Sequence, residues 1–151
     1  MEKMKTDIRT KWETTDLGEP SKIIGIEITR SSKGMFIGQR LYIESILQHK
    51  GMECVNPIAM PLDPGSPLLP NPDRNEGDWS NSYAWVLGGL QFIVNTTRPD
   101  IAYAVSQLAS YMANPSLQHV GVLKRILRYL QGTKEYGITY QAQTPQDSSL
   151  F

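Results

Sequence analysis

The stretch NTTRPDIAYAVSQLASYM, residues 95–112, predicts a tight corner between two helices. Pro99 suits the first turn of a helix, where its missing N–H costs no hydrogen bond. Asp100 lies in the same turn, close to the positive end of the helix dipole. We therefore expect one helix to end at about Asn95–Thr97 and the next to begin at Arg98. An ion pair between Arg98 and Asp100 would hold the corner.

Helical spacing of apolar residues continues on both sides of this corner. Helices are expected over about Asn81–Val94, Asp100–Ala113 and Ser116–Gln131, followed by a short strand at Tyr136–Tyr140. The pair Gly88-Gly89 lies within the first helix at a cost of about 1 kcal/mol per glycine relative to alanine. Such a pair makes sense where another helix crosses closely. The side chains expected to face inward are Tyr83, Val86, Leu87, Leu90 and Val94, then Ile101, Val105, Leu108 and Met112, and finally Val120, Leu123, Leu127 and Leu130.

The first 50 residues contain two further helical patterns. Met4, Ile8 and Trp12 recur every four residues and predict an amphipathic helix over about Glu2–Glu13. A second helix is expected over about Arg40–His49, with Gly51 after its end. Its inward side chains are expected to be Leu41, Ile43, Ile46 and Leu47.

Between these helices the pattern changes to that of a β-hairpin. Strands are expected over Lys22–Arg30 and Met35–Ile37, joined by a turn at residues 31–34. Gly25 weakens a strand unless another backbone or a ligand comes close. The row Ile24, Ile26 and Ile28 needs a cover, which we expect the first helix to provide.

Residues 53–80 contain six prolines (57, 61, 64, 67, 70 and 72) among Asp, Asn and Gly. This composition predicts an extended connector with little regular structure. The fold class is therefore expected to be α+β, with an N-terminal helix and hairpin, a helical bundle and a short C-terminal strand. The expected divisions are residues 1–50, a connector at 51–80, a helical lobe at 81–132 and a strand and tail at 133–151.

Composition limits the classes of protein that are expected. The 15 basic and 15 acidic residues balance, so a nucleic-acid site would need local clustering of charge. Cys54 is the only cysteine, which excludes a disulfide framework, and we expect a half-buried thiol. The charged start MEKMKTDIR does not resemble a signal peptide, and no apolar run is long enough to cross a membrane. An intracellular protein, cytoplasmic or nuclear and not secreted, is expected.

Catalytic patterns are weak. Two-metal phosphoryl transfer needs carboxylates fixed on adjacent elements. Glu27 is the only acid in a predicted strand, while Asp7, Glu13, Asp16 and Glu19 are spread over a helix and its exit. His49 and His119 are far apart without metal-ligand spacing, so we expect surface or capping roles for them. The sequence therefore predicts no catalytic residues and no cofactor or metal in this chain.

Several motifs in fixed order resemble the reverse transcriptase region of Ty1/copia-type retrotransposon polyproteins. The motifs that carry the resemblance are Thr15-Asp16-Leu17-Gly18-Glu19, Gly25-Ile26-Glu27-Ile28, Gln39…Tyr42-Ile43…Ile46-Leu47, Tyr83…Leu87-Gly88…Leu90, Thr97-Arg98-Pro99-Asp100-Ile101, Ala104-Val105, Asn114-Pro115…His119, Lys124–Thr133 and Tyr136-Gly137. The resemblance covers about Met4–Tyr140. Ala84-Trp85 and Ser21-Lys22-Ile23 depart from the family pattern.

The resemblance implies a piece of an RNA-directed DNA polymerase. It implies the end of the palm and a primer-grip-like hairpin with the first thumb helix in residues 1–50, and a thumb-like lobe at 81–132. Residues 133–151 would then lead toward a ribonuclease H domain. The polymerase and ribonuclease H carboxylates of the family have no counterpart in this sequence, so no activity is expected alone. The Mg²⁺ ions would belong to the intact enzyme.

Local clusters of basic residues are the candidate nucleic-acid contacts. Lys124, Arg125 and Arg128 avoid the apolar stripe of their helix, and Lys134 lies just past its end. Lys124 and Arg128 are four residues apart, and hence neighbours on the helix surface, where they could track phosphates. The alternative is a solvated helix face.

The hairpin carries a second candidate set. Lys22, Arg30 and Lys33 flank it, and Met35 and Phe36 lie at the start of its second strand. Cations for phosphates beside an apolar shelf for sugars would suit a primer strand. The alternative is an ordinary hairpin with polar ends. For the opening corner, Arg98 could meet a nucleic-acid backbone only in the intact enzyme.

Two functions follow from these observations. The first is a non-catalytic clamp on an RNA–DNA or DNA template–primer. The alternative is a retroelement-derived structural or protein–protein interaction module, such as a domesticated transposable element, without a nucleic-acid role. Besides nucleic acid, the expected partners are the rest of the polyprotein or a second copy of the chain, and no membrane.

Overall fold

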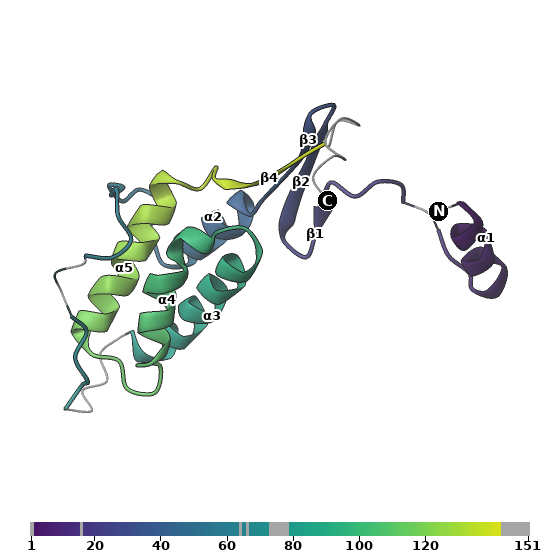
Figure 1. Ribbon diagram of the computed structural model, residues 1–151. Coiled ribbons are helices and arrows are strands. Elements are labelled where there is room, and N and C mark those ends of the chain that lie inside the picture. The colour runs from purple at the N-terminus through teal and green to yellow at the C-terminus, as the bar shows by residue number, and fades with distance from the viewer. Residues whose placement is uncertain (1, 16, 64, 66, 73–78, 143–151) are drawn as a thin grey trace, which may run out of the picture.

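Figure 1 shows the computed structural model, which describes residues 2–15, 17–63, 65, 67–72 and 79–142. A helical bundle forms one end of the molecule, a β-sheet extends from it, and the helix α1 lies beyond the sheet. The predicted α+β class is confirmed. The predictions on Asp16 and on the tail at 143–151 lie outside the described residues, as does part of the connector.

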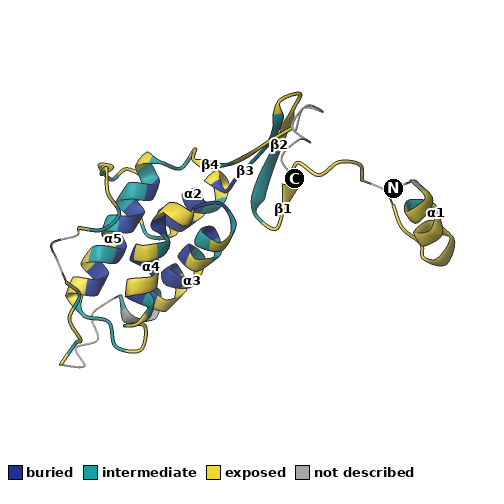
Figure 2. Cartoon of the chain, in the orientation of Figure 1, coloured by how far each residue is buried: buried dark blue, intermediate teal, exposed yellow. Residues whose placement is uncertain are grey.

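The bundle consists of α2 (Arg40–His49), α3 (Ser80–Thr96), the 3-10 turn η1 (Pro99–Ile101), α4 (Ala102–Ala109) and α5 (Leu117–Gly132). α5 packs against the other three helices, and the buried faces turn inward in Figure 2. α2, which the sequence analysis grouped with the hairpin, contributes to this same core. The core residues are Ile43, Ile46, Leu47, Met52, Tyr83, Val86, Leu87, Leu90, Ile93, Ile101, Ala104, Val105, Leu108, Val120, Leu123, Ile126, Leu127 and Leu130.

Three of the predicted inward positions were wrong or only partly right. Leu41 is exposed because Ile43 and Ile46 lie on the opposite side of α2. Met112 is exposed because α4 ends at Ala109, three residues before it. Val94 is only partly buried, since Ile93 faces the core in its place.

One glycine of the predicted pair has the close crossing. A Cβ built on Gly89 would lie 2.9 Å from Ile46 Cδ1 and 3.3 Å from the Tyr42 hydroxyl, both on α2. A Cβ on Gly88 would meet nothing within 4 Å. Close contact between α2 and α3 therefore requires a glycine at position 89 and not at position 88.

The corner at Arg98 is a buried charge network. Its guanidinium is 1% exposed, and its Nε and one terminal nitrogen donate to the two carboxylate oxygens of Asp100 at 2.9 and 2.7 Å. The guanidinium also donates to the Thr133 carbonyl and hydroxyl oxygens, each at 2.7 Å. The rings of Tyr129 and Tyr136 lie 5.5 Å from the guanidinium carbon. The Arg98–Asp100 pair therefore fastens the start of η1 to the residue that follows α5.

Asp100 is held as a carboxylate. Burial acts to raise its pKa, but hydrogen bonds from Arg98 and Tyr129 outweigh that effect and leave the pKa below its ordinary value. The Tyr129 hydroxyl donates to Asp100 Oδ2 at 2.8 Å. Because Arg98 is enclosed in this way, its guanidinium donates its hydrogen bonds to groups of the fold itself.

The sheet has the order β1 (Lys22–Ile23), β2 (Ile26–Ser31), β3 (Gly34–Gly38) and β4 (Gly137–Gln141), all antiparallel. Pairing of β3 with β4 joins the hairpin to the chain that leaves α5. A Cβ on Gly137 would lie 2.2 Å from the Ile37 carbonyl oxygen, so this pairing requires a glycine there.

The predicted single strand over Lys22–Arg30 was wrong, because the chain reverses inside it. Ile24 and Gly25 have φ values of 49° and 79° and form a two-residue turn between β1 and β2. Two successive positive φ angles match the twist of a tight hairpin, which explains Gly25 better than a close ligand does. Ile24 adopts a backbone conformation that is strained for a β-branched residue.

The first helix does not cover the isoleucine row. α1 (Glu2–Lys11) exposes Met4, Ile8 and, just past its end, Trp12 by 68%, 45% and 70%, and it lies apart from the sheet in Figure 1. The prediction was wrong because two apolar residues among ten give the helix little area to bury.

The connector has no helix or strand among its described residues and runs beside α5. Cys54 within it is exposed, so the expected half-buried thiol was wrong. Across the described part of the chain, no helix combines the length and the apolar character that a membrane crossing requires.

Amide hydrogen exchange should distinguish the sheet from the bundle. We expect Ile23–Ile28 to exchange faster than Val120–Leu130, because β1 is exposed and β2 is only half-buried. The measurement is hydrogen–deuterium exchange at two protein concentrations. Protection that rises with concentration would indicate strand pairing with a second copy. Equal protection of both segments at every concentration would contradict the expectation.

Replacement of Arg98 by lysine should destabilise the bundle. Lysine keeps the charge but cannot bond Asp100 and Thr133 together, so we expect Arg98→Lys to lower the free energy of unfolding by about 3 kcal/mol. Chemical denaturation measures the change. Arg40→Lys is the matched control, since Arg40 pairs with Glu44 and Glu135 at the surface. This substitution should leave the denaturation midpoint nearly unchanged.

Candidate nucleic-acid interface

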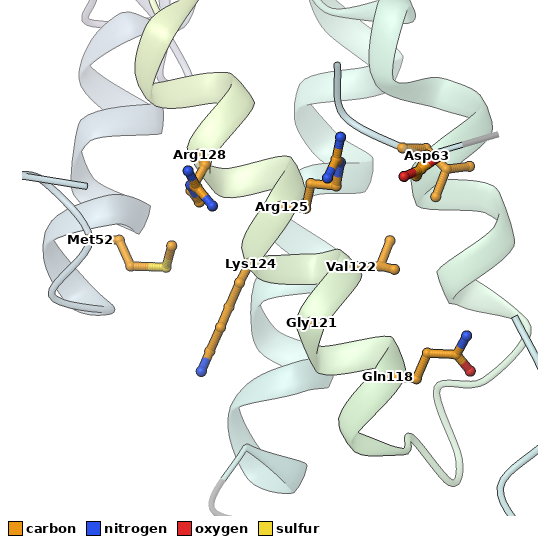
Figure 3. Close-up of a pocket in the computed structure, with 9 residues that line it drawn as sticks. Met52, Asp63, Gln118, Gly121, Val122, Lys124, Arg125 and Arg128 are labelled. Carbon is orange, nitrogen blue, oxygen red and sulfur yellow. The ribbon is translucent and has the colours of Figure 1, made fainter. Parts of the chain in front are cut away.

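Lys124, Arg125 and Arg128 line one open cavity of about 500 Å³ between α5 and the connector. Figure 3 shows the three side chains leaving the same helix, with Met52 on one side and Asp63 on the other. We call this cavity the basic groove. Its other lining residues are Leu62, Gln118, Gly121 and Val122.

The groove follows from the amphipathic pattern of α5. Val120, Leu123 and Leu127 turn toward the core, so the positions between them are left for polar side chains. Gly121 leaves open space, because a Cβ there would meet nothing within 4 Å.

Two of the basic residues also hold the connector. Arg125 Nε donates to the Met60 carbonyl at 3.3 Å, and Arg128 Nε donates to the Asn56 carbonyl at 2.9 Å. Both bonds use the inner guanidinium nitrogen. Among the described residues, no hydrogen-bond acceptor engages the terminal nitrogens of these two side chains, so both can meet a ligand.

Two glutamines extend this row along α5. Gln118 Nε2 donates to the Pro67 carbonyl at 2.9 Å, and Gln131 Nε2 donates to the Glu53 carbonyl at 2.7 Å. The polar face of α5 therefore mainly binds the connector, and only part of this face is open to solvent. This role could not be predicted from the sequence, because the partners are 51 and 78 residues apart.

The groove carries excess positive charge. Its lining includes three cations and one carboxylate, Asp63, so the net charge of the lining is +2. Asp63 Oδ1 accepts from the Gly65 amide at 3.2 Å. Among the described residues, Lys124, Arg125 and Arg128 take part in none of the ion pairs.

Lys134 belongs to a different cluster. Its ammonium lies 2.9 Å from Glu44 Oε1, and Arg40 pairs with both Glu44 and Glu135. The hydrogen bond from Lys134 holds the pKa of Glu44 below its ordinary value. Neighbouring carboxylates therefore compensate the charge of Lys134.

The hairpin candidates lie on the sheet, away from the basic groove (Figure 1). Lys22 and Lys33 are exposed. Arg30 donates to the Pro20 carbonyl at 2.7 Å and lies 3.5 Å from Glu19 Oε2, so it fastens the preceding segment. The structure therefore brings the α5 set together and keeps it apart from the hairpin set.

Met35 and Phe36 of the same hairpin are half-buried. The Phe36 ring lies over two glycines, since a Cβ on Gly38 or Gly137 would come within 3.0 Å of a ring atom. The apolar shelf expected at the hairpin is thus partly filled by packing within the sheet.

The histidines have separate surroundings. His49 is exposed and lies 4.5 Å from the Trp85 ring. His119 is buried and completes a capping box at the start of α5, where its Nδ1 accepts from the Ser116 amide at 2.8 Å. Within the described ranges, no three His, Cys, Asp or Glu residues come close enough to hold a metal ion.

The comparisons with known proteins give a consistent result. No family model matches the chain, and the search of solved structures found no match. The chain is 36% identical over 132 residues to the retrovirus-related Pol polyprotein from transposon RE1 of Arabidopsis thaliana, covering 87% of this chain and 9% of that protein. It is 32% identical over 138 residues to the Pol polyprotein from transposon TNT 1-94 of Nicotiana tabacum, covering 87% and 10%.

A shorter relative is an uncharacterized mitochondrial protein of Arabidopsis thaliana, 35% identical over 125 residues, covering 82% of this chain and 50% of that protein. The chain therefore spans about a tenth of the Pol polyproteins and half of this relative. These matches support a fragment of a retrotransposon Pol polyprotein. The type of polyprotein is Ty1/copia, as the motifs of the chain predicted.

His119 should give the stability of the chain a pH dependence. Since Nδ1 accepts a hydrogen bond, the folded ring is neutral, with its proton on Nε2. Burial lowers its pKa from 6.5, partly opposed by the Leu69 backbone. The unfolded chain then binds more protons than the folded chain below about pH 7, so the free energy of unfolding should fall as the pH drops through 6.5.

Denaturation at pH 7, 6 and 5 measures this slope. His119→Gln keeps a capping-box side chain without titrating and should flatten the slope. His49→Gln removes an exposed histidine and should leave the slope as in the unmodified chain. An unchanged slope in His119→Gln would contradict the assignment.

Proposed function

We propose that the chain is a non-catalytic part of a copia-type reverse transcriptase that holds template–primer nucleic acid in the basic groove. The observation that carries this proposal is the convergence of Lys124, Arg125 and Arg128 on one open cavity without carboxylate partners among the described residues. Cations grouped in this way attract a phosphate backbone, although the whole chain is neutral.

The groove would bind by positioning phosphates. Lys124 supplies a point charge, while the guanidinium groups of Arg125 and Arg128 present planar sets of donors toward phosphate oxygens. Bonds from their Nε atoms to the connector restrict both arginines before any ligand arrives. Because the two side chains are already restricted, binding would cost less side-chain conformational entropy.

The hairpin would supply a second, weaker contact. Lys22 and Lys33 are exposed there, and Met35 and Phe36 offer a half-buried apolar surface. We assign no metal to the described residues, since they lack a cluster of ligands. Any Mg²⁺ would bind in the parts of the polymerase that carry the catalytic carboxylates.

Fluorescence anisotropy with a labelled RNA–DNA hybrid tests the proposal. We expect a dissociation constant of about 1–100 μM at low salt, which weakens steeply as salt increases. Arg128→Gln should weaken binding and reduce the slope of log affinity against log salt by about 0.9, the value for one phosphate contact.

Two controls separate charge from packing. Arg128→Lys keeps the charge but loses the Nε bond to Asn56, so it should retain the salt slope. Lys11→Gln removes an exposed charge on α1 and should bind as the unmodified chain does. Absence of binding at about 100 μM and low salt would exclude the proposal for this chain.

A second candidate function is a protein-interaction module. Exposed Met4, Ile8 and Trp12 on and after α1 favour it, since apolar side chains in one row fit a protein surface. A partner would be another part of the polyprotein. Self-association that is insensitive to salt, together with no binding to the hybrid, would favour this candidate over the first.

A further inference from the structure

Two tryptophans and two lysines form a surface cluster beside the basic groove. Lys50 Nζ lies 5.3 Å from the Trp79 ring centre and 5.7 Å from the Trp85 ring centre. Lys124 Nζ lies 4.8 Å from the Trp79 ring centre. We call Lys50, Trp79, Trp85 and Lys124 the tryptophan cluster.

The cluster is continuous with the groove because Lys124 belongs to both. Three helices build it. Lys50 follows the end of α2, Trp79 and Trp85 lie at the start of α3, and Lys124 lies on α5. Neither lysine is in an ion pair with a described carboxylate.

The Trp85 residue is only partly buried by the fold. His49 lies against its ring at 4.5 Å, yet the residue remains 51% exposed. Trp79, by contrast, is half-buried and packs against the core. An indole that is half open to solvent, with ammonium groups nearby, has the chemistry that binds an unpaired base and its phosphate.

A paired duplex cannot use such a ring, since its bases are already stacked on one another. A single strand that leaves a duplex exposes base faces and continues the phosphate chain. Because Lys124 links the cluster to the groove, one strand could contact both.

We propose that Trp85 stacks an unpaired base of a single-stranded overhang whose adjoining phosphates contact Lys50 and Lys124. This inference rests on the proposed function for the duplex contact in the basic groove. It adds a ligand class, a duplex with a single-stranded extension, and a residue that discriminates it from a blunt duplex.

The test compares three ligands and three variants by fluorescence anisotropy. The first two ligands are a blunt RNA–DNA hybrid and the same hybrid with an overhang of about six nucleotides, a length within the site sizes of single-strand binders. The third ligand is the overhang strand alone, as a single-stranded oligonucleotide. Trp85→Leu should weaken binding of the overhang hybrid about ten-fold and leave binding of the blunt hybrid unchanged. Trp85→Phe keeps an aromatic face and should retain most of the affinity.

Tyr103→Leu is the matched control, since Tyr103 is an exposed aromatic residue on α4, 69% exposed. It should bind both ligands as the unmodified chain does. Tryptophan fluorescence supplies a second readout. The overhang hybrid should quench it in the unmodified chain, and less so in Trp85→Leu.

The outcomes distinguish the two proposals. If Trp85→Leu binds the overhang hybrid normally, the stacking role is overturned and the groove stands. If Trp85→Leu weakens both hybrids equally, the indole shapes the groove and the stacking role is also overturned. If only a single-stranded oligonucleotide binds, and Trp85→Leu abolishes it, stacking stands and the duplex clamp fails. Binding of none of these ligands overturns both.

Discussion

The buried guanidinium of Arg98 is the interaction on which the rest of the bundle depends. A charge removed from water in this way needs hydrogen-bond partners. Oxygen atoms of Asp100 and Thr133 accept the hydrogen bonds of the guanidinium. Because Thr133 follows α5, the same bonds set where that helix ends relative to the α3–α4 corner. The position of the chain that forms β4 follows from this junction.

Side chains with two roles connect stability to the proposed function. Arg125 and Arg128 fasten the connector through their inner nitrogens and keep their outer nitrogens toward the basic groove. The connector thus forms one wall of the groove, although it has no regular structure of its own among the described residues. A neutral chain gains a locally positive surface because several of its carboxylates pair with cations outside the groove, as Glu44 does with Lys134.

The relation to Pol polyproteins of the Ty1/copia type gives this arrangement a context. In the proposed function, a rigid bundle presents cations to nucleic acid while the chemistry belongs to other parts of the polyprotein. The position Trp85 departs from the family pattern quoted for its motif. The tryptophan cluster is therefore a feature of this chain that the resemblance does not supply.

The sequence by itself determined the local elements. Apolar spacing located four bundle helices and β4 within a few residues, since a helix periodicity or a proline at the first turn acts over neighbouring residues only. The grouping of cations on α5 was also predicted, because these residues lie on one helix and their spacing is local. The reversal at Ile24-Gly25 was missed, because alternating isoleucines favour a strand more strongly than a single glycine favours a turn.

Only the tertiary structure decided which distant segments meet. Thr133 bonds a residue 35 positions earlier, Gln131 bonds one 78 positions earlier, and β4 pairs with β3 across about a hundred residues. Such contacts depend on how buried faces pack and on where polar groups find partners, and neither is encoded in local spacing. For the same reason the groove and the tryptophan cluster could not be read from the chain alone. The groove is assembled from α5 and the connector, and the cluster from three separate segments that one core brings together.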